Sequence, residues 1–450
     1  MTRATVVMTI AGSDSGGGAG IEADIKTIAA LGLHGTCAIT SVTSQNTTGV
    51  LSTFELPAEV VASQVDAICT DMHVEWAKSG MLSSSGIIST VSDRVLKYGL
   101  KLVVDPVMAA EAGGDLLRKD AIRTLKEELL PISQVVTPNI NEAVALSGTT
   151  ITTVEEAKQA ARIIAWTGVK AVIITGGHLD ASDVIYEAKE DRFTVIPGKF
   201  VKGGTHGSGC TYAAALTCGL AQGMTIVEAA SKAKDLVVRA IIASRTVGKG
   251  AGPVDPLAGI RRDATAYEVT EDLKEAVNII SSSVYFVRMI PQVGCNIAMA
   301  LPDAKGTEDV AAVAGRIVKL KDSPRAVGDV GFGVSGHVAR IVLAAMEHDG
   351  NLRAAMNMKY SEEIIGMCKE MGLKVASFER AQEPENAIIT HTGEWGTSDA
   401  IRKHGYVPDI IFDRGAVGKE PMIRILGRNA TEVARTADSI AANYAARSKN

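Results

Sequence analysis

Short apolar runs rich in β-branched residues alternate with longer amphipathic segments through the first half of this 450-residue chain. These runs lack the polar alternation of a half-exposed strand, so each predicts a strand buried on both faces, at 5–11, 101–105, 134–137 and 171–175. The segments between them predict helices over 21–31, 57–69, 85–98, 115–129 and 154–167, and 183–186 with 192–196 predicts a hairpin. This alternation favours an α/β fold, a mostly parallel sheet with helices on both faces.

A dense run of glycine and proline, from Gly248 to Pro256, ends this pattern after a predicted helix at 225–247. We therefore expect a first domain over 1–247, a linker over 248–263, and a second mixed α/β domain over 264–450. For the second domain the pattern predicts helices at 268–283, 307–313, 336–346, 361–371, 394–404 and 431–447, and strands at 296–300, 326–330, 374–378, 410–412 and 422–426.

Composition excludes several classes of protein. The net charge of −5 gives no basic footprint for nucleic acid. Six widely spaced cysteines without a CxxC pair argue against zinc sites and disulfides, and for a reducing cytoplasm. Neither a targeting segment nor an apolar span of membrane length is visible. We expect a soluble cytoplasmic protein that binds neither nucleic acid nor membrane.

The loop from Gly203 to Thr211 is the first candidate site. It leads into an apolar helix expected from Cys210 to Gln222, so the amides of Gly207 and Gly209, with Ser208 between them, meet the positive end of a helix. This geometry suits the charge on a transferring phosphoryl group, and it should favour the thiolate of Cys210. Read alone, the loop is equally consistent with a tight turn holding a small buried cysteine.

Two common phosphate motifs do not fit. The first loop, Gly12 to Gly18, lacks the Lys-Ser/Thr that completes a P-loop. No Gly-rich loop here follows a strand with the spacing GxGxxG, which disfavours a dinucleotide fold.

Six further segments accompany the loop at 205–211, in this order: 10–24, 43–47, 78–82, 104–108, 137–143 and 176–178. Together they resemble the hydroxymethylpyrimidine and hydroxymethylpyrimidine-phosphate kinases (ThiD-like) of the ribokinase superfamily, over roughly residues 6–246. The resemblance implies a ribokinase-like fold that uses ATP and Mg²⁺ to phosphorylate an aminopyrimidine alcohol and then its monophosphate.

The resemblance also implies substrate contacts. Gln45 would pair its amide with the ring nitrogen and exocyclic amine of the pyrimidine, and Met81 and Val107 would sandwich the ring. Asp24 would hold the substrate hydroxyl. From the residues alone, the glutamine reads equally as a loop residue, the apolar pair as core, and the aspartate as a surface charge or cap.

The remaining kinase residues follow from the same resemblance. Glu142, with Asn139, would organise magnesium through water, and Asp105 is a second candidate for the metal. Cys210 stands where ribokinases carry a catalytic Asp, so it would orient or deprotonate the accepting hydroxyl. Thr175 and Ser208 would contact the nucleotide.

Two departures from this family concern the nucleotide. Thr175 stands where the family has Lys, and Gly204 stands where members commonly have Asn. Lys202 is the nearby lysine that could substitute for the missing one.

The second half offers one comparable loop. Residues 331–337, ending in His337, lead from an expected strand into a helix, again an anion-binding geometry. The cations that could reach phosphate oxygens are Arg316, Arg325, Arg340, Arg353 and Lys419, although scattered arginines usually mark a solvated face.

Residues 291–298, 309–318, 330–341, 353–357, 408–411 and 415–427 resemble the archaeal-type thiamine-phosphate synthase domain (ThiN-like). The resemblance implies condensation of hydroxymethylpyrimidine diphosphate with hydroxyethylthiazole phosphate. Arg316 would clamp phosphate oxygens, His337 would assist departure of diphosphate, and Arg353 and Lys419 would bind substrate.

Two alternatives stay open at this point. The second half could be a ligand-sensing module, because the same domain type occurs beside DNA-binding helices. The first half could be a pyridoxal kinase, since vitamin B6 kinases share its fold. Relatives of both domains usually self-associate, so we expect a homo-oligomer, a dimer or larger.

Overall fold

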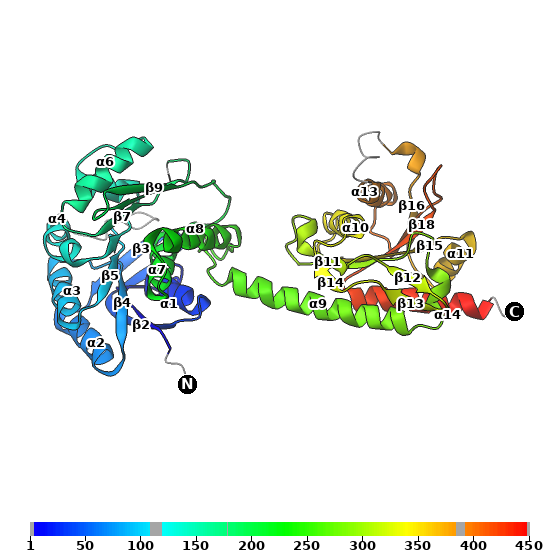
Figure 1. Cartoon of the computed structure of the whole chain (residues 1–450), viewed down its shortest axis with the longest axis horizontal. Coiled ribbons are helices and arrows are strands. Elements are labelled where there is room, and N and C mark those ends of the chain that lie inside the picture. Colours follow the sequence, from blue (N-terminus) through cyan, green and yellow to red (C-terminus); the bar gives the residue numbers. More distant parts are fainter. Residues whose placement is uncertain (1–3, 109–118, 178, 384–391, 448–450) are drawn as a thin grey trace. The chain divides into compact units, whose positions relative to one another are not determined.

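The computed structural model describes residues 4–108, 119–177, 179–383 and 392–447. It divides into two compact units, Met1–Ile260 and Arg261–Asn450, each described here by itself (Figure 1). His178 and the first part of the helix expected over 115–129 lie outside the described residues. No described helix is long and apolar enough to cross a lipid bilayer.

The first unit is built on a nine-stranded sheet with the order β3-β2-β1-β4-β5-β6-β7-β8-β9. Strands β2, β1, β4, β5, β6 and β7 run parallel, and β3, β8 and β9 pair antiparallel at the edges. Their bounds are β1 Val6–Asp14, β2 His34–Asn46, β3 Gly49–Glu55, β4 Val74–Ser79, β5 Lys101–Val104, β6 Val135–Val136, β7 Ala171–Ile174, β8 Asp183–Glu187 and β9 Arg192–Ile196.

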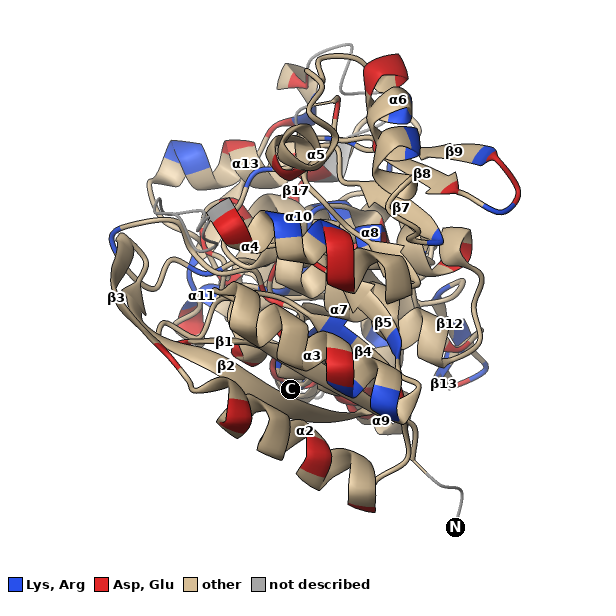
Figure 2. Ribbon diagram, turned by 90° about the vertical axis from the view of Figure 1, so that its left-hand side faces the viewer, with Lys and Arg blue, Asp and Glu red and all other residues tan. Residues whose placement is uncertain are grey.

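Helices cover both faces of this sheet, as the buried strands require. One face packs on α2 Ala58–Asp71, α3 Ser85–Tyr98, α4 Lys119–Thr124, α5 Ile140–Ser147 and α6 Val154–Ala165. The other packs on α1 Gly20–Ala30, α7 Ser208–Ala221 and α8 Ile226–Ile242. Neighbouring residues of one strand point to opposite layers: Val104 joins the first core and Val103 the second. Charged positions gather on outer helices such as α2 and α6 and on the β8–β9 hairpin (Figure 2).

The strand order predicts a crevice at the carboxyl ends of the central parallel strands. β1 has β2 on one side and β4 on the other, so the chain winds in opposite directions from this strand. In open α/β sheets ligands bind at the carboxyl ends of the strands near such a reversal. The residues that directly follow β4, β5, β6 and β7 line a cavity at this position.

The second unit holds a seven-stranded sheet with the order β14-β11-β10-β15-β18-β17-β16, antiparallel except for β16 with β17. Its strands are β10 Ile297–Ala300, β11 Val310–Val313, β14 Val330–Phe332, β15 Ala354–Lys359, β16 Val375–Ser377, β17 Ile410–Asp413 and β18 Met422–Gly427, with a separate hairpin of β12 Ile317–Leu320 and β13 Ser323–Ala326. Helices α9 Ala258–Ser282, α11 Glu362–Glu370 and α14 Ala430–Arg447 cover one face, and α10 His337–Met346 and α13 Thr392–His404 cover the other.

Three predictions of local structure were wrong. The helix expected over 307–313 is a short 3₁₀ turn followed by strand β11, because alanine-rich residues 310–313 are fully buried between two helical layers. The strand expected at 326–330 is a turn between β13 and β14. Helix α9 begins at Ala258, inside the expected linker and ten residues before the expected helix start at Glu268.

Strands β2, β3, β4, β12 and β15 were not predicted. Several carry polar residues or alanine at positions that the packing buries, which hides the strand pattern.

Candidate active sites

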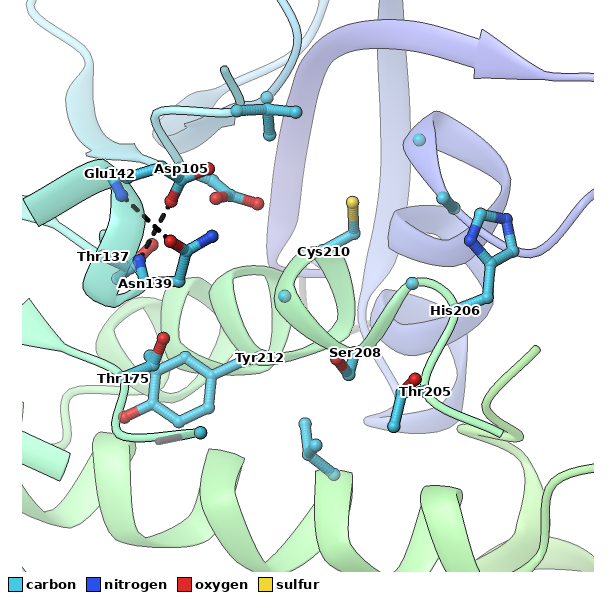
Figure 3. A pocket seen from close by; sticks show the side chains of 18 of the residues that line it. Asp105, Thr137, Asn139, Glu142, Thr175, Thr205, His206, Ser208, Cys210 and Tyr212 are labelled. Atoms are coloured by element: carbon cyan, nitrogen blue, oxygen red, sulfur yellow. Dashed lines mark hydrogen bonds between the residues drawn. The ribbon is translucent and has the colours of Figure 1, made fainter. Parts of the chain in front are cut away.

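The first unit contains a cavity of about 1000 Å³ at the carboxyl edge of its parallel strands. The ends of β1, β4, β5, β6 and β7 line it, together with the first turn of α7 (Figure 3). Of the kinase residues predicted from sequence, all except Asp24 line this cavity: Gln45, Met81, Asp105, Val107, Asn139, Glu142, Thr175, Gly207, Ser208, Gly209 and Cys210.

The anion loop adopts the expected geometry. Gly207 caps α7 with a φ of +81°, a left-handed conformation that favours glycine. A Cβ on Gly207 would also lie 1.8 Å from the carbonyl oxygen of Gly18, so the two Gly-rich loops touch at this point. A Cβ on Gly209 would meet nothing within 4 Å, which leaves space beside the first turn of the helix.

Cys210 points its sulfur into the cavity, between the carboxylates on one side and His206 on the other (Figure 3). The expectation that the helix N-terminus favours a thiolate was wrong for the ligand-free chain. Burial raises the pKa of Cys210 to about 12; the charge of Lys78 opposes this rise, and the negative charges of Asp24 and Asp105 add to it. The resting side chain at neutral pH is a thiol.

Asp24 does not face the substrate cavity, contrary to the prediction. Its side chain is fully buried beneath the cavity. It accepts hydrogen bonds from Thr9 Oγ1 at 2.6 Å and from Lys78 Nζ at 2.9 and 3.1 Å. Both carboxylate oxygens are therefore used inside the protein, and Asp24 is a structural partner of Lys78.

Lys78 was not predicted, although it lines the cavity from β4. Its side chain is 1% exposed and its ammonium lies 3.8 Å from Asp105 Oδ2 as well as against Asp24. Burial opposes the charge, but the carboxylate of Asp24 holds the pKa of Lys78 above its ordinary value. The sequence of β4, VEWAKS, also contains Glu75 and Ser79, so it gave only a weak signal that Lys78 is buried.

The part of the cavity beside Gln45 contains a second unpredicted pair, Asp14 and His206. His206 Nε2 lies 2.9 Å from Asp14 Oδ2 and 3.4 Å from Gln45 Nε2. Despite its burial, His206 and the amides of Gly16, Gly18 and Ala19 lower the pKa of Asp14 to about 2. The carboxylate fixes His206 beside Gln45, the residue expected to read the aminopyrimidine.

Asp105 and Glu142 are two neighbouring buried carboxyls, and the charge of Lys78 only partly balances that of Asp105. Burial raises the pKa of Asp105 to about 6, and burial together with Asp105 raises the pKa of Glu142 to about 8. Asp105 Oδ2 is buried without a hydrogen-bond partner. Glu142 forms a reciprocal capping box with Asn139 (Figure 3).

These features fit a divalent cation. Among the described residues no cluster of three or more metal-ligating side chains occurs. Magnesium needs fewer, because it keeps several waters and commonly binds one or two carboxylates plus substrate phosphates.

The nucleotide end of the cavity contains Thr175, whose amide donates to the carbonyl of Pro138 at 2.9 Å. Lys202 is exposed and is not among the cavity-lining residues, whereas Lys199 and Lys234 are. Lys234 pairs with the buried Asp183 at 2.8 Å. The structure therefore does not place Lys202 at the cavity, and Lys234, which does line it, is already paired with Asp183.

In the second unit, His337 is the first residue of α10 and is exposed. The Arg340 guanidinium folds back over this helix end, since a Cβ on Gly336 would lie 3.3 Å from Arg340 Nη2. Desolvation and the charges of Arg424, Arg380, Arg340 and Arg316, in that order, lower the pKa of His337 to about 4. The imidazole of His337 is therefore neutral at physiological pH, and four arginines lie near it.

The predicted cations divide between the two ends of the sheet. Arg316 donates through Nη1 to the carbonyl of Val293, just before β10, and lies within electrostatic reach of His337. Arg353 donates to the carbonyl of Ala300, at the opposite end of the same strand. The structure thus separates Arg353 from Arg316, and the prediction that both serve one substrate site is not supported by their positions.

A buried charge network, which sequence reasoning missed, lies at the end of the sheet that holds Arg316. Asp413 accepts from Arg380 Nε at 2.6 Å and from Arg424 Nη1 at 2.8 Å. Arg424 is fully buried in β18, and its guanidinium lies 4.9 Å from the ring centre of Phe378. Lys419 lies 3.5 Å from the buried Glu383.

Comparisons with known proteins agree with both halves of this picture. The sequence model of the phosphomethylpyrimidine kinase family matches residues 14–255, and that of thiamine-phosphate synthase ThiN matches residues 272–439. A hydroxymethylpyrimidine/phosphomethylpyrimidine kinase from Rhizobium meliloti is 44% identical over 55% of this chain and 96% of its own length. The pyridoxal kinase of Bacillus subtilis, solved as an ADP complex, superimposes with a TM-score of 0.54 at 34% identity, covering 57% of this chain and 99% of that one.

A bifunctional thiamine biosynthesis protein ThiDN from Methanocaldococcus jannaschii is 35% identical over 98% of this chain and 99% of its own. This match spans both units, so the relative is similar to this chain over both units in the same order. The chain belongs to the ThiDN family of bifunctional thiamine biosynthesis proteins, in which a phosphomethylpyrimidine kinase precedes a ThiN-type thiamine-phosphate synthase.

Proposed function

We propose that each unit performs one of the two activities of this family. The first unit uses ATP to phosphorylate 4-amino-5-hydroxymethyl-2-methylpyrimidine and then its monophosphate. The second unit condenses the resulting diphosphate with hydroxyethylthiazole phosphate, which gives thiamine phosphate and diphosphate. The observation that carries the kinase assignment is the single cavity in which Gln45, Cys210 and the Asp105–Glu142 pair converge.

The pyrimidine would bind beside Gln45, between Met81 and Val107, all of which line the cavity. The Gln45 amide carries both an acceptor and donors, which match the ring nitrogen and exocyclic amine of the substrate. Asp14 supports this contact by holding His206 against the glutamine. The cavity of about 1000 Å³ exceeds the need of the pyrimidine alone and leaves room for a nucleotide.

Phosphoryl transfer would take place at the first turn of α7. The substrate oxygen forms a bond to the γ-phosphorus while the bond to the departing ADP oxygen breaks, and the amides of Gly207 to Cys210 receive the charge on the transferred group. Because Cys210 rests as a thiol, we assign it the orientation of the accepting hydroxyl. The hydroxyl proton leaves late, after P–O bond formation has made it acidic.

Asp105 and Glu142 would hold magnesium, in part through water. When bound, the ion neutralises charge on the nucleotide phosphates. Burial and the proximity of the two carboxyls raise both pKa values, and a bound divalent cation would offset this effect.

In the second unit, the carbon–oxygen bond to diphosphate breaks and the thiazole nitrogen donates its lone pair to the exposed methylene carbon. Charge develops on the leaving diphosphate, so cations and N–H donors there should lower the barrier. His337 would donate a hydrogen bond from its neutral ring to the leaving group, and Arg316 would clamp a phosphate.

The test is incubation of the full chain with the pyrimidine alcohol, MgATP and thiazole phosphate, followed by identification of the products. Thiamine phosphate, with one ADP for each phosphorylation, supports the proposal. Binding of both synthase substrates without product would identify the second unit as a sensor. A higher kcat/KM on pyridoxal than on the pyrimidine alcohol would overturn the kinase assignment, and light scattering would test the expected homo-oligomer.

A further inference from the structure

Arg424 is the least satisfied charged group in the described part of the second unit. Its side chain is fully buried in β18, and only Nη1 has a partner, Asp413. Its Nε and Nη2 are buried with no hydrogen-bond acceptor. Leaving donors of a buried cation unpaired is costly, so a site that keeps such a group usually supplies an acceptor at some stage of its function.

The surroundings of Arg424 are those of an anion site. Asp413 binds both guanidinium groups, because its two oxygens also accept from Arg380 Nε and Nη2 at 2.6 and 3.2 Å. One carboxylate thus holds two cations side by side and leaves a net positive charge. Arg380 is 8% exposed, so it reaches the surface where Arg424 does not.

The N-terminus of α10 faces the same charges. Arg424 and Arg380 are the two strongest charge influences on His337, the first residue of that helix. The side chains of Arg424 and of α10 lie in the same layer, since neighbouring Leu426 packs in one core with Val338 and Ile341. A helix end and two guanidinium groups therefore converge on one region, where Asp413 and Glu383 are the acidic groups that the described residues place against Arg424.

We propose that Arg380, Arg424 and the first turn of α10 form the diphosphate-binding base of the synthase site, and that Asp413 is the positioning residue that aligns both guanidinium groups. This inference rests on the proposed synthase function. Arg380 contacts the diphosphate directly. In the ligand-free chain the free N–H groups of Arg424 are covered, so a covering side chain shifts before a phosphate oxygen reaches them.

The test uses the full chain supplied with pyrimidine diphosphate and thiazole phosphate, which bypasses the kinase. The variants are Arg380→Met, Arg424→Lys and Asp413→Asn. Arg424→Lys keeps a charge for Asp413 but removes the forked donors. We expect the first two to raise KM for the pyrimidine diphosphate and the inhibition constant of inorganic diphosphate together, by about tenfold or more. KM for thiazole phosphate should stay within about twofold.

Asp413→Asn should weaken inhibition by diphosphate in the same way, with a smaller effect on KM for thiazole phosphate than a general loss of structure would give. Arg435→Met is the matched control, because that arginine is exposed on α14, which covers the opposite face of the sheet, and should change neither constant. Kinase activity and the melting temperature of each variant report folding. If Arg424→Lys does not fold, Arg380→Met, whose side chain is 8% exposed, still tests the inference.

Unchanged inhibition by diphosphate in Arg380→Met and Arg424→Lys would overturn the inference, as would an equal effect of Arg435→Met. A parent chain that makes no thiamine phosphate from these substrates would instead overturn the proposed synthase function. The two failures are therefore distinguishable.

Discussion

The two sites use a similar physical arrangement and reach opposite results. Each places its reactive side chain, Cys210 or His337, in the first turn of a helix near a buried cation that is paired with a carboxylate. In the kinase cavity burial dominates over the opposing charge of Lys78, and the pKa of the thiol rises. In the synthase site partial desolvation and four guanidinium groups act on an imidazole that still has solvent-exposed surface, and its pKa falls.

The comparison shows that a helix N-terminus does not by itself set the protonation state of a residue. Its field is worth roughly 0.3–1 kcal/mol at an exposed position, whereas desolvation of a buried group can shift a pKa by several units. In both sites the reactive group rests uncharged, so the arriving phosphates meet a neutral side chain among fixed cations and amides.

The largest expected effect separates the two activities. Cys210→Ala should lower kcat of the kinase by about 100- to 10,000-fold, because the hydroxyl loses the group that orients it. Synthase activity, measured with pyrimidine diphosphate supplied, should not change. A variant that phosphorylates the pyrimidine alcohol at a near-normal rate would remove Cys210 from the mechanism.

The next effect concerns the buried pair beneath Cys210. Lys78→Met should destabilise the protein by about 3–5 kcal/mol, because it leaves the carboxylate of Asp24 buried without its cation. Chemical denaturation would measure this change. Lys26→Met is the matched control, since Lys26 is exposed and its ammonium donates to the carbonyl of Gly17 rather than to a carboxylate.

The double variant Lys78→Met with Asp24→Leu sharpens the comparison further. Removing both charges should restore most of the stability, because no unpaired buried ion remains. If the pair also serves Cys210, the kinase should stay slow in this stable protein. Full recovery of both stability and kcat would show that the pair is purely structural.

His337→Ala should have the complementary effect of Cys210→Ala. Loss of a donor to the leaving diphosphate should reduce kcat of the synthase by about 100- to 1,000-fold and leave the kinase unchanged. Assay of both activities on one preparation makes each the folding control for the other. Normal condensation by this variant would contradict the assigned role of His337.

The loops were predictable from the sequence because their chemistry is local. Glycine at position 207 follows from its left-handed backbone. Gln45, near the end of β2, and Cys210, in the first turn of α7, belong to motifs of fixed spacing. Asp24 was assigned wrongly because Thr9 and Lys78, which consume its oxygens, come from two other strands. No local pattern contains that information.

The buried cations carried a signal that was overlooked. Arg424 interrupts the apolar strand 422–426 with a single charge, whereas Lys78 follows Trp76 and Ala77 in a strand that also carries Glu75 and Ser79. A charge at an inward position needs a partner, so such an interruption indicates a buried ion pair near a site. The partner itself, Asp24 or Asp413, could be identified only after the sheet brought the strands together.

The smallest effect tests the charge state on which the comparison depends. With a pKa of about 4, His337 should stay neutral as the pH falls from 8 to 5, whereas an ordinary histidine gains its proton near pH 6.5. Nuclear magnetic resonance of histidine-labelled protein would follow this, with His337→Gln to assign the resonance. Inorganic diphosphate should move the apparent pKa upward, because an anion beside the ring offsets the arginines and stabilises the imidazolium. A resonance that titrates near pH 6.5 and ignores diphosphate would place His337 outside the field of Arg380 and Arg424, and the two sites would then share only the helix end.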